Sequence, residues 1–130
     1  MGSKLFEDNP GFDSLVWPSF FKIAFSITDD FLDILKNNID GSSINTIIAK
    51  DILKNSGDSD YYNGLEENLL NNEYVEGESL FFFPYDWRLD LGGVATNLMH
   101  RIEDIKSQTG AQKVDVVSHS MGGLLLKEYF

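Results

Sequence analysis

The chain has 130 residues, of which 42% are hydrophobic, and it contains no cysteine. This length suits one small domain with a core, and the lack of thiols excludes a disulfide, a thiolate nucleophile and a cysteine-ligated metal. The formal net charge of −11 argues against binding to nucleic acid, which needs basic surface, and against electrostatic attachment to an anionic membrane.

The first half of the chain predicts little regular structure. Residues 1–20 are expected to be irregular, with a turn at the Asn-Pro-Gly of residues 9–11. A short helix is predicted over residues 31–38, with Thr28-Asp29-Asp30 as its cap. The apolar stretch 44–53 is too short to be assigned by its periodicity. A further turn and a polar loop are expected at residues 40–43 and 55–60.

The second half predicts helices that alternate with buried strands. Apolar residues recur at helical spacing over residues 60–72 and 93–108, and Thr109-Gly110 ends the second of these helices. Two short apolar runs, residues 80–83 and 113–117, predict strands that are buried on both faces. Because a crossover helix joins these two runs, they predict a parallel sheet and hence an α/β fold.

The most informative stretch is Val-Asp-Val-Val-Ser-His-Ser-Met-Gly-Gly at residues 114–123. A strand, a sharp turn of small residues and a helix are typical of a nucleophile elbow, with Ser120 exposed at the tip. The cramped turn needs small residues two positions before and after the serine, and here these are Ser118 and Gly122. The usual motif has glycine at the first of these positions. An ordinary strand-to-helix turn remains the alternative interpretation.

A second motif, Pro84-Tyr85-Asp86-Trp87-Arg88, follows the first predicted strand. Pro84 would end the strand, because it has no N–H to donate. Asp86 can pair with Arg88, and Trp87 adds a large apolar body near the end of the sheet. By itself this motif predicts a rigid strand exit with a satisfied ion pair.

Together the two motifs resemble the lecithin:cholesterol acyltransferase family of α/β-hydrolases, which includes lysosomal phospholipase A2-like enzymes. Residues 84–88 and 118–123 carry the resemblance, and residues 1–5 with Val16-Trp17-Pro18 are similar to the family's oxyanion loop. The resemblance implies an incomplete α/β-hydrolase fold: one partial domain over residues 1–130. The expected parts are an oxyanion-loop and lid-like region (1–60) and a βαβα core with the elbow near its end (61–130).

The resemblance also implies a serine-dependent acyltransferase, or a lipase or phospholipase, in lipid metabolism. Ser120 would be the nucleophile that forms the acyl-enzyme, and the backbone amide of Met121 would be one oxyanion donor. Gly123 completes the elbow, and the second donor is expected at or just before Met1. The expected substrate is a lipid or another acyl ester, with membrane contact only at the lipid interface. No cofactor or metal is expected, since no His, Asp or Glu cluster shows ligand spacing.

A serine nucleophile needs a histidine base and a carboxylate, which follow the serine in α/β-hydrolases. The ten residues after Ser120 include no Asp and no His, and Glu128 would face away from the site. His119 is expected to pack beside the nucleophile, and His100 to lie on a helix surface. We therefore expect the chain to be an inactive and unstable piece of a larger enzyme, with the triad acid and base outside it.

Two alternatives remain open from the residues. The chain could belong to another serine α/β-hydrolase, such as an esterase, thioesterase or amidase, because all of these share the elbow. It could also be an inactive scaffold or interaction module. The sequence shows no signal peptide, and its longest apolar stretch, residues 20–27, is too short for a transmembrane helix. The compartment and the oligomeric state are left undetermined.

Overall fold

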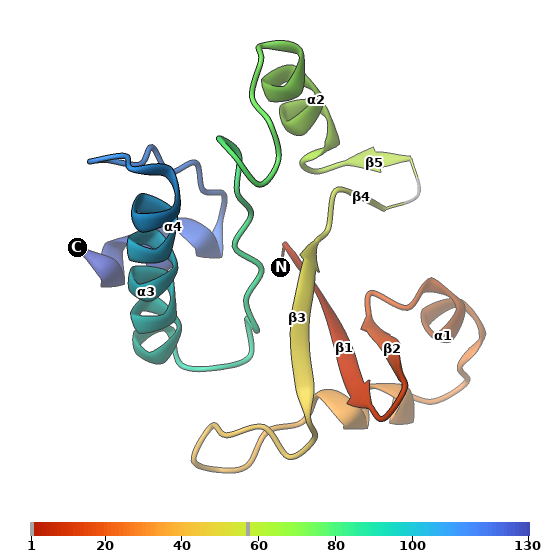
Figure 1. The fold of residues 1–130 in the computed structure, drawn as a ribbon. Coiled ribbons are helices and arrows are strands. Elements are labelled where there is room, and N and C mark those ends of the chain that lie inside the picture. The colour runs from red at the N-terminus through yellow and green to blue at the C-terminus, as the bar shows by residue number, and fades with distance from the viewer. Residues whose placement is uncertain (1, 57) are drawn as a thin grey trace.

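A computed structural model describes residues 2–56 and 58–130, apart from the side chains of residues 20–22 (Figure 1). The described chain combines an antiparallel sheet formed by its first half with helices in its second half. The elements in chain order are β1 (Ser3–Asn9), β2 (Phe12–Trp17), α1 (Phe20–Phe25), a 3-10 helix (Asp30–Leu35), β3 (Ile47–Ile52), β4 (Asn55–Ser56), β5 (Ser59–Asp60), α2 (Asn63–Asn71), α3 (Leu91–Thr109) and α4 (Met121–Tyr129).

The main sheet has the strand order β2-β1-β3, and both pairings are antiparallel. The predicted turn at residues 9–11 is confirmed: Gly11 adopts a φ of 94° and joins β1 to β2 in a hairpin. The prediction of irregular structure for residues 1–20 is wrong. Strand β1 contains no β-branched residue, but its alternate side chains Ser3 and Leu5 are buried against the rest of the molecule.

The middle of the chain is more regular than its pattern indicates. The unassigned apolar stretch 44–53 contains β3, and the predicted loop 55–60 contains the small β4–β5 hairpin. The predicted helix over residues 31–38 is a 3-10 helix, and its N-cap Asp29 makes no side-chain capping hydrogen bond. A short segment without a side-chain cap has little to stabilise an α-helix, and 3-10 helices are common in such short pieces.

The two predicted helices of the second half are confirmed as α2 and α3. Helix α3 begins where the Asp90 carboxylate accepts the Gly93 N–H at 3.0 Å, and it ends at Gly110, whose φ is 74°. Its apolar face packs against Leu125 of α4 and forms a core of its own. That core consists of Val94, Ala95, Leu98, Ile102 and Leu125.

The two predicted parallel strands are not formed. Among the described residues, the segments 80–83 and 113–117 are assigned to no strand, and Leu80 makes only an isolated bridge with Glu76. Val116 and Val117 are 44% and 74% exposed rather than buried. A strand forms only where a neighbour accepts and donates its backbone hydrogen bonds, and neither segment pairs with a strand of the described sheets. The described fold therefore contains helices and strands, but its sheet is antiparallel and residues 61–130 do not form a βαβα unit.

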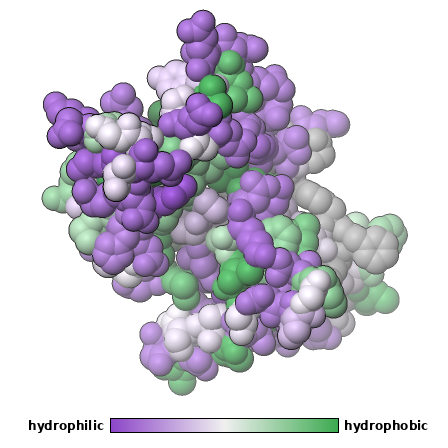
Figure 2. All heavy atoms as spheres, in the orientation of Figure 1, coloured by the Kyte–Doolittle hydropathy of each residue, from purple (hydrophilic) through white to green (hydrophobic). Residues whose placement is uncertain are grey.

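The segment that carries the Pro-Tyr-Asp-Trp-Arg motif runs between β3 and α3 and links the sheet to the helices (Figure 1). Several large hydrophobic side chains remain on the surface, among them Phe12, Ile39 and Leu124. Figure 2 shows such hydrophobic residues between hydrophilic ones on the visible face. None of the helices in the described part of the chain is both long enough and apolar enough to cross a bilayer.

Candidate active site

Ser120 adopts a backbone conformation that few residues with a side chain tolerate. Its φ is 56° and its ψ is −122°, and it stands immediately before α4. This combination lies outside the left-handed helical region and costs a non-glycine residue about 1–3 kcal/mol. Two short-range hydrogen bonds close the turn: Gly122 N–H donates to the His119 carbonyl at 3.0 Å, and Gly123 N–H to the Ser120 carbonyl at 2.9 Å. The exposed Ser120 thus stands on a strained turn that leads into a helix.

The small residues of this turn face each other as their spacing predicts. A Cβ added to Gly122 would lie 3.4 Å from the Ser118 Cβ, and one added to Gly123 would lie 3.9 Å from the Ser118 Oγ. Ser118 and Gly122 are therefore in contact, and a larger residue at either position would crowd the turn. Met121 is the first residue of α4, so its N–H belongs to the unpaired, positive end of the helix.

His119 packs against an aromatic side chain from a distant part of the chain. Its ring meets the Tyr62 ring edge to face, with centroids 6.2 Å apart and an interplanar angle of 78°. Tyr62 stands immediately before α2. His119 is otherwise exposed. His100 is exposed on α3, as expected.

The first described residues lie against two tyrosines. A Cβ added to Gly2 would be 3.0 Å from the Tyr62 Oη, so a larger residue at this position would have to displace Tyr62. The buried Ser3 hydroxyl accepts the Tyr85 N–H at 3.0 Å. The fold therefore places part of the predicted oxyanion loop beside Tyr62, which also contacts the elbow. Met1, the expected neighbour of the second oxyanion donor, lies outside the described residues.

Burial raises the pKa of the Tyr85 phenol, and the neighbouring Tyr62 adds to this rise. An ordinary tyrosine pKa is already near 10. Tyr85 therefore stays protonated at neutral pH, and its hydroxyl remains able to donate a hydrogen bond.

Asp86 and Arg88 form the expected ion pair, and it is almost fully buried. The Arg88 Nη2 lies 2.5 Å from the Asp86 Oδ2, and the two side chains are only 4% and 7% exposed. Arg88 also donates to the Leu35 carbonyl at 3.1 Å and to the Ser43 Oγ at 3.0 Å. Asn37 returns a hydrogen bond to the Arg88 carbonyl at 3.0 Å. The pair thus fastens the loop of residues 35–43 to the segment that precedes α3.

Trp87 packs against Trp17 at the end of β2, with ring centroids 5.8 Å apart and an interplanar angle of 66°. Both indole N–H groups are buried without a hydrogen-bond partner among the described residues. Outside the motif, Trp87 contacts Trp17 and Arg88 contacts residues 35–43, so the motif joins two distant parts of the chain. The predicted ion pair is confirmed, whereas the predicted strand exit is wrong, because residues 80–83 form no strand.

A partly buried ion pair near α2 could not be foreseen from the sequence. The Lys54 Nζ lies 2.7 Å from the Glu66 Oε1, and Glu66 is buried. The hydrogen bond to Glu66 raises the pKa of Lys54, and the ammonium also stands 5.2 Å from the centre of the Phe82 ring. The Lys54 carbonyl accepts the N–H groups of Tyr61, Tyr62 and Asn63. Lys54 therefore fixes the start of α2, but its pairing with Glu66 depends on the β4–β5 hairpin and leaves no signal in the sequence.

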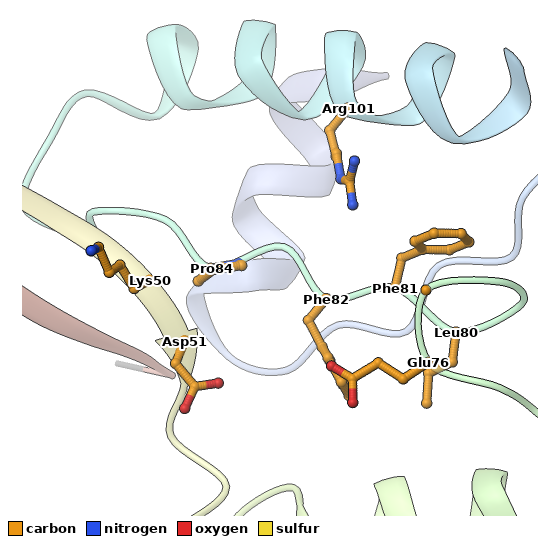
Figure 3. Close-up of a pocket in the computed structure, with 9 residues that line it drawn as sticks. Lys50, Asp51, Glu76, Leu80, Phe81, Phe82, Pro84 and Arg101 are labelled. Atoms are coloured by element: carbon orange, nitrogen blue, oxygen red, sulfur yellow. The ribbon is translucent and has the colours of Figure 1, made fainter. Parts of the chain in front are cut away.

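Two grooves flank the segment between β3 and α3. The first, of about 240 Å³, is lined by Lys50 and Asp51 of β3, by Phe81, Phe82 and Pro84, and by Arg101 of α3, among others (Figure 3). In it, Arg101 points toward Phe81, with its guanidinium carbon 5.6 Å from the ring centre. The second, of about 230 Å³, lies between Ala49 and Val94 and includes Tyr85 and Asp86. No elbow residue lines either groove. Within residues 2–56 and 58–130, no three His, Cys, Asp or Glu side chains gather as a metal site.

Comparison with known proteins shows what the chain is similar to. Residues 38–130 match the family model of lecithin:cholesterol acyltransferase. Lecithin-cholesterol acyltransferase-like 4 of Arabidopsis thaliana is 33% identical over 69 residues, which cover 52% of this chain and 13% of that protein. Phospholipase A(1) LCAT3 of the same plant is 33% identical over 70 residues, or 51% of this chain and 15% of that protein.

Human phosphatidylcholine-sterol acyltransferase is 36% identical over 69 residues, which cover 51% of this chain and 16% of that protein. The matched region thus spans less than a fifth of the length of each of these relatives. No solved structure matches the chain.

Proposed function

The chain belongs to the lecithin:cholesterol acyltransferase family, and on that premise we propose that it carries the nucleophile of a serine acyltransferase or phospholipase. The substrate class is a lipid ester. This choice is supported by the names of its relatives, which include a phospholipase A(1) and phosphatidylcholine-sterol acyltransferases. The family model covers both the Pro-Tyr-Asp-Trp-Arg motif and the elbow.

The backbone of Ser120 is the observation that carries this proposal. A φ of 56° with a ψ of −122° is unfavourable for serine, and such strain gathers at functional sites. In the elbow it exposes the Oγ and places it beside the N-terminus of α4, where the Met121 N–H can stabilise negative charge. A turn with a purely structural role and this backbone would be expected to carry glycine at position 120, because glycine adopts the conformation at far lower cost.

The proposed reaction has two halves that share one intermediate. The Ser120 Oγ attacks the acyl carbonyl and gives its proton to a histidine base, while the Met121 N–H stabilises the oxyanion. The ester C–O bond then breaks, the leaving alcohol takes the proton, and the acyl group stays on Ser120. Water or a second alcohol attacks this acyl-enzyme in the other half, which releases a fatty acid or a new ester.

We place the triad base and acid in the rest of a longer protein. His119 packs on Tyr62, and the described chain offers Ser120 no histidine–carboxylate pair. The same protein would supply the strands that pair with residues 80–83 and 113–117 and so complete an α/β-hydrolase sheet. In this proposal residues 1–130 form part of one domain. Residues 1–60 are its oxyanion-loop and lid-like region, and residues 61–130 contain its elbow.

The test uses the complete protein with a fluorescent phospholipid ester and a serine-reactive fluorophosphonate. Ser120→Ala should abolish labelling and lower the turnover number by at least about 10³-fold, as loss of a serine nucleophile does. Ser118→Ala is the matched control, because it removes a neighbouring hydroxyl and keeps a small side chain. Esterase activity that survives in Ser120→Ala would overturn the proposal. Added alcohol acceptors then distinguish transfer from hydrolysis through the product formed.

A further inference from the structure

Tyr62 connects the two parts of the chain from which the proposed oxyanion site is built. On one side its ring meets the ring of His119, the residue before Ser120, edge to face at 6.2 Å. On the other side its Oη and Cε2 lie 3.0 and 3.1 Å from the position of a Cβ at Gly2. Tyr62 thus fills the space between the elbow and the start of β1.

The molecule holds Tyr62 firmly in this place. The Tyr62 N–H donates to the Lys54 carbonyl at 3.0 Å, and its own carbonyl accepts the Glu66 N–H at 2.9 Å as α2 begins. The Lys54 ammonium then pairs with the buried Glu66 carboxylate at 2.7 Å. Lys54, just before β4, and Glu66, in the first turn of α2, therefore hold the backbone of Tyr62 from both sides.

We infer that Tyr62 is a positioning residue that sets the distance between the Gly2 segment and the elbow. This inference rests on the proposed function, because it concerns the site at which the acyl-enzyme forms. One oxyanion donor belongs to the helix after Ser120, and the second is expected at or just before Met1, which precedes Gly2 in the sequence. Tyr62 touches neither Ser120 nor the substrate in this account. It acts through His119 on one side and through Gly2 on the other.

The spacing matters because an oxyanion hole works only where its donors lie about 3 Å from the oxygen that gains charge. A shift of about 1 Å in a catalytic group can lower a rate by up to 10²-fold. This spacing requires a residue without a side chain at position 2. A methyl group there would push against Tyr62 and so widen the distance between the two parts of the site.

The experiment measures how fast a fluorophosphonate labels Ser120 in the complete protein, as a function of probe concentration. For Tyr62→Ala, we expect the saturating rate to fall about tenfold, a typical cost of a misplaced catalytic group. The probe concentration at half-maximal rate should stay unchanged. Tyr62→Phe keeps the ring and should restore the rate. Tyr61→Ala is the matched control, because Tyr61 donates its N–H to the same carbonyl while its side chain is half exposed.

A double-mutant cycle then tests whether Gly2 acts through Tyr62. Gly2→Ala should slow labelling about tenfold in the wild type, yet have little further effect beside Tyr62→Ala, where the obstructing ring is gone. If Tyr62→Ala does not fold, as its melting curve will tell, the cycle is read with Tyr62→Leu. There the effect of Gly2→Ala should be smaller than in the wild type, because both the Oη and the Cε2 that face Gly2 are removed.

Three results would overturn the inference: unchanged rates in Tyr62→Ala and Gly2→Ala, purely additive effects in the cycle, or an equal loss in Tyr61→Ala. The Ser120→Ala variant separates these from a failure of the proposed function. Activity that survives Ser120→Ala removes both proposals. An enzyme that needs Ser120 but ignores Tyr62 and Gly2 removes this one alone.

Discussion

Any residue with a Cβ is strained at position 120, because the Cβ is what makes the backbone conformation of the elbow unfavourable. Ala keeps that Cβ and Gly removes it. We therefore expect Ser120→Gly to be more stable than Ser120→Ala by about 1 kcal/mol, the strain relieved less the extra entropy that glycine loses on folding. Chemical denaturation of the two variants measures this difference, and neither variant is catalytic.

The opposite ranking would show that the elbow relaxes when the Ser120 hydroxyl is removed. A matched pair at Gly93 gives the reference value, because a Cβ built there meets nothing within 4 Å inside α3. There Gly93→Ala should stabilise the protein by a few tenths to about 1 kcal/mol, as alanine does in a helix.

The turn at Ser120 could be foreseen because its constraints are local. Ser118 and Gly122 are separated from the serine by one residue each, and the spacing alone indicates that both must be small. Tyr62 could not be foreseen, because its contact with His119 joins segments that are far apart in the sequence. Its helical spacing with Leu65 and Leu69 favours a place on the apolar face of α2, whereas in the structure Tyr62 precedes that helix.

The Asp86–Arg88 pair holds the loop of residues 35–43 in place, and its burial predicts a large effect when it is broken. Asp86→Asn leaves the Arg88 charge buried without its partner, which costs about 3–5 kcal/mol. Arg88→Lys should cost a similar amount, because a single ammonium cannot reach Asp86, Leu35 and Ser43 together. Urea denaturation measures the loss. Hydrogen exchange should show it first as reduced protection in residues 35–43.

The exposed pair between Glu103 and Lys106 on α3 is the control for this prediction. Lys106→Met should change stability by no more than about 0.5 kcal/mol, because solvent screens such pairs. An equal effect of Lys106→Met and Asp86→Asn would mean that burial does not set the strength of the Asp86–Arg88 pair.

Helices and strands differed in how well the sequence predicted them. Helix α3 carries local signals, its apolar face and the stop at Gly110, so residues 93–108 could be predicted as a helix. Its start at Leu91 is set by the Asp90 cap, which the apolar pattern does not reveal. Strand β1 lacks such signals, because it exists through its pairing with β2 and with β3. Residues 80–83 and 113–117 show the converse: their composition suits strands, but composition cannot supply the neighbour that a strand needs.

Alkaline pH should lower the free energy of unfolding through two titrating groups, Lys54 and Tyr85. The hydrogen bond to Glu66 raises the pKa of Lys54, and burial raises the pKa of Tyr85. In the unfolded chain the corresponding values lie near 10.4 and 10. Below about pH 10 the stability from both groups is fully present. As the pH rises further, the unfolded state releases its protons first, so the free energy of unfolding falls.

Urea midpoints at pH 8 and at about pH 10.5 test this expectation. Tyr85→Phe should lose less stability between the two pH values than the wild type, because it removes one of the two titrating groups. Tyr61→Phe, at an exposed position, should lose as much as the wild type. A Tyr85→Phe variant with the same loss would show that burial of this phenol does not couple to folding.

Contacts between distant residues govern the assembly of this protein. The hydrogen bond between Ser3 and Tyr85 joins residues that are 82 positions apart, and Arg88 reaches back 45 positions to Ser43 and 53 to Leu35. The fold class could be predicted as a mixture of helices and strands, but these contacts, and with them the antiparallel arrangement, could not. No periodicity or cap in one segment records which other segment it will meet.

These distant contacts also set an order of events on the ribosome. At about 5–20 residues per second, Tyr85 is synthesised roughly 4 to 16 s after Ser3. The hairpin of β1 and β2 can form early, but the Ser3 hydroxyl and the Leu35 carbonyl must remain bonded to water until the Pro-Tyr-Asp-Trp-Arg segment arrives. The sheet of the nascent N-terminal half therefore remains uncovered for several seconds, during which chaperones can bind it. Synonymous codons that slow translation between residues 53 and 84 would lengthen that window without changing the protein.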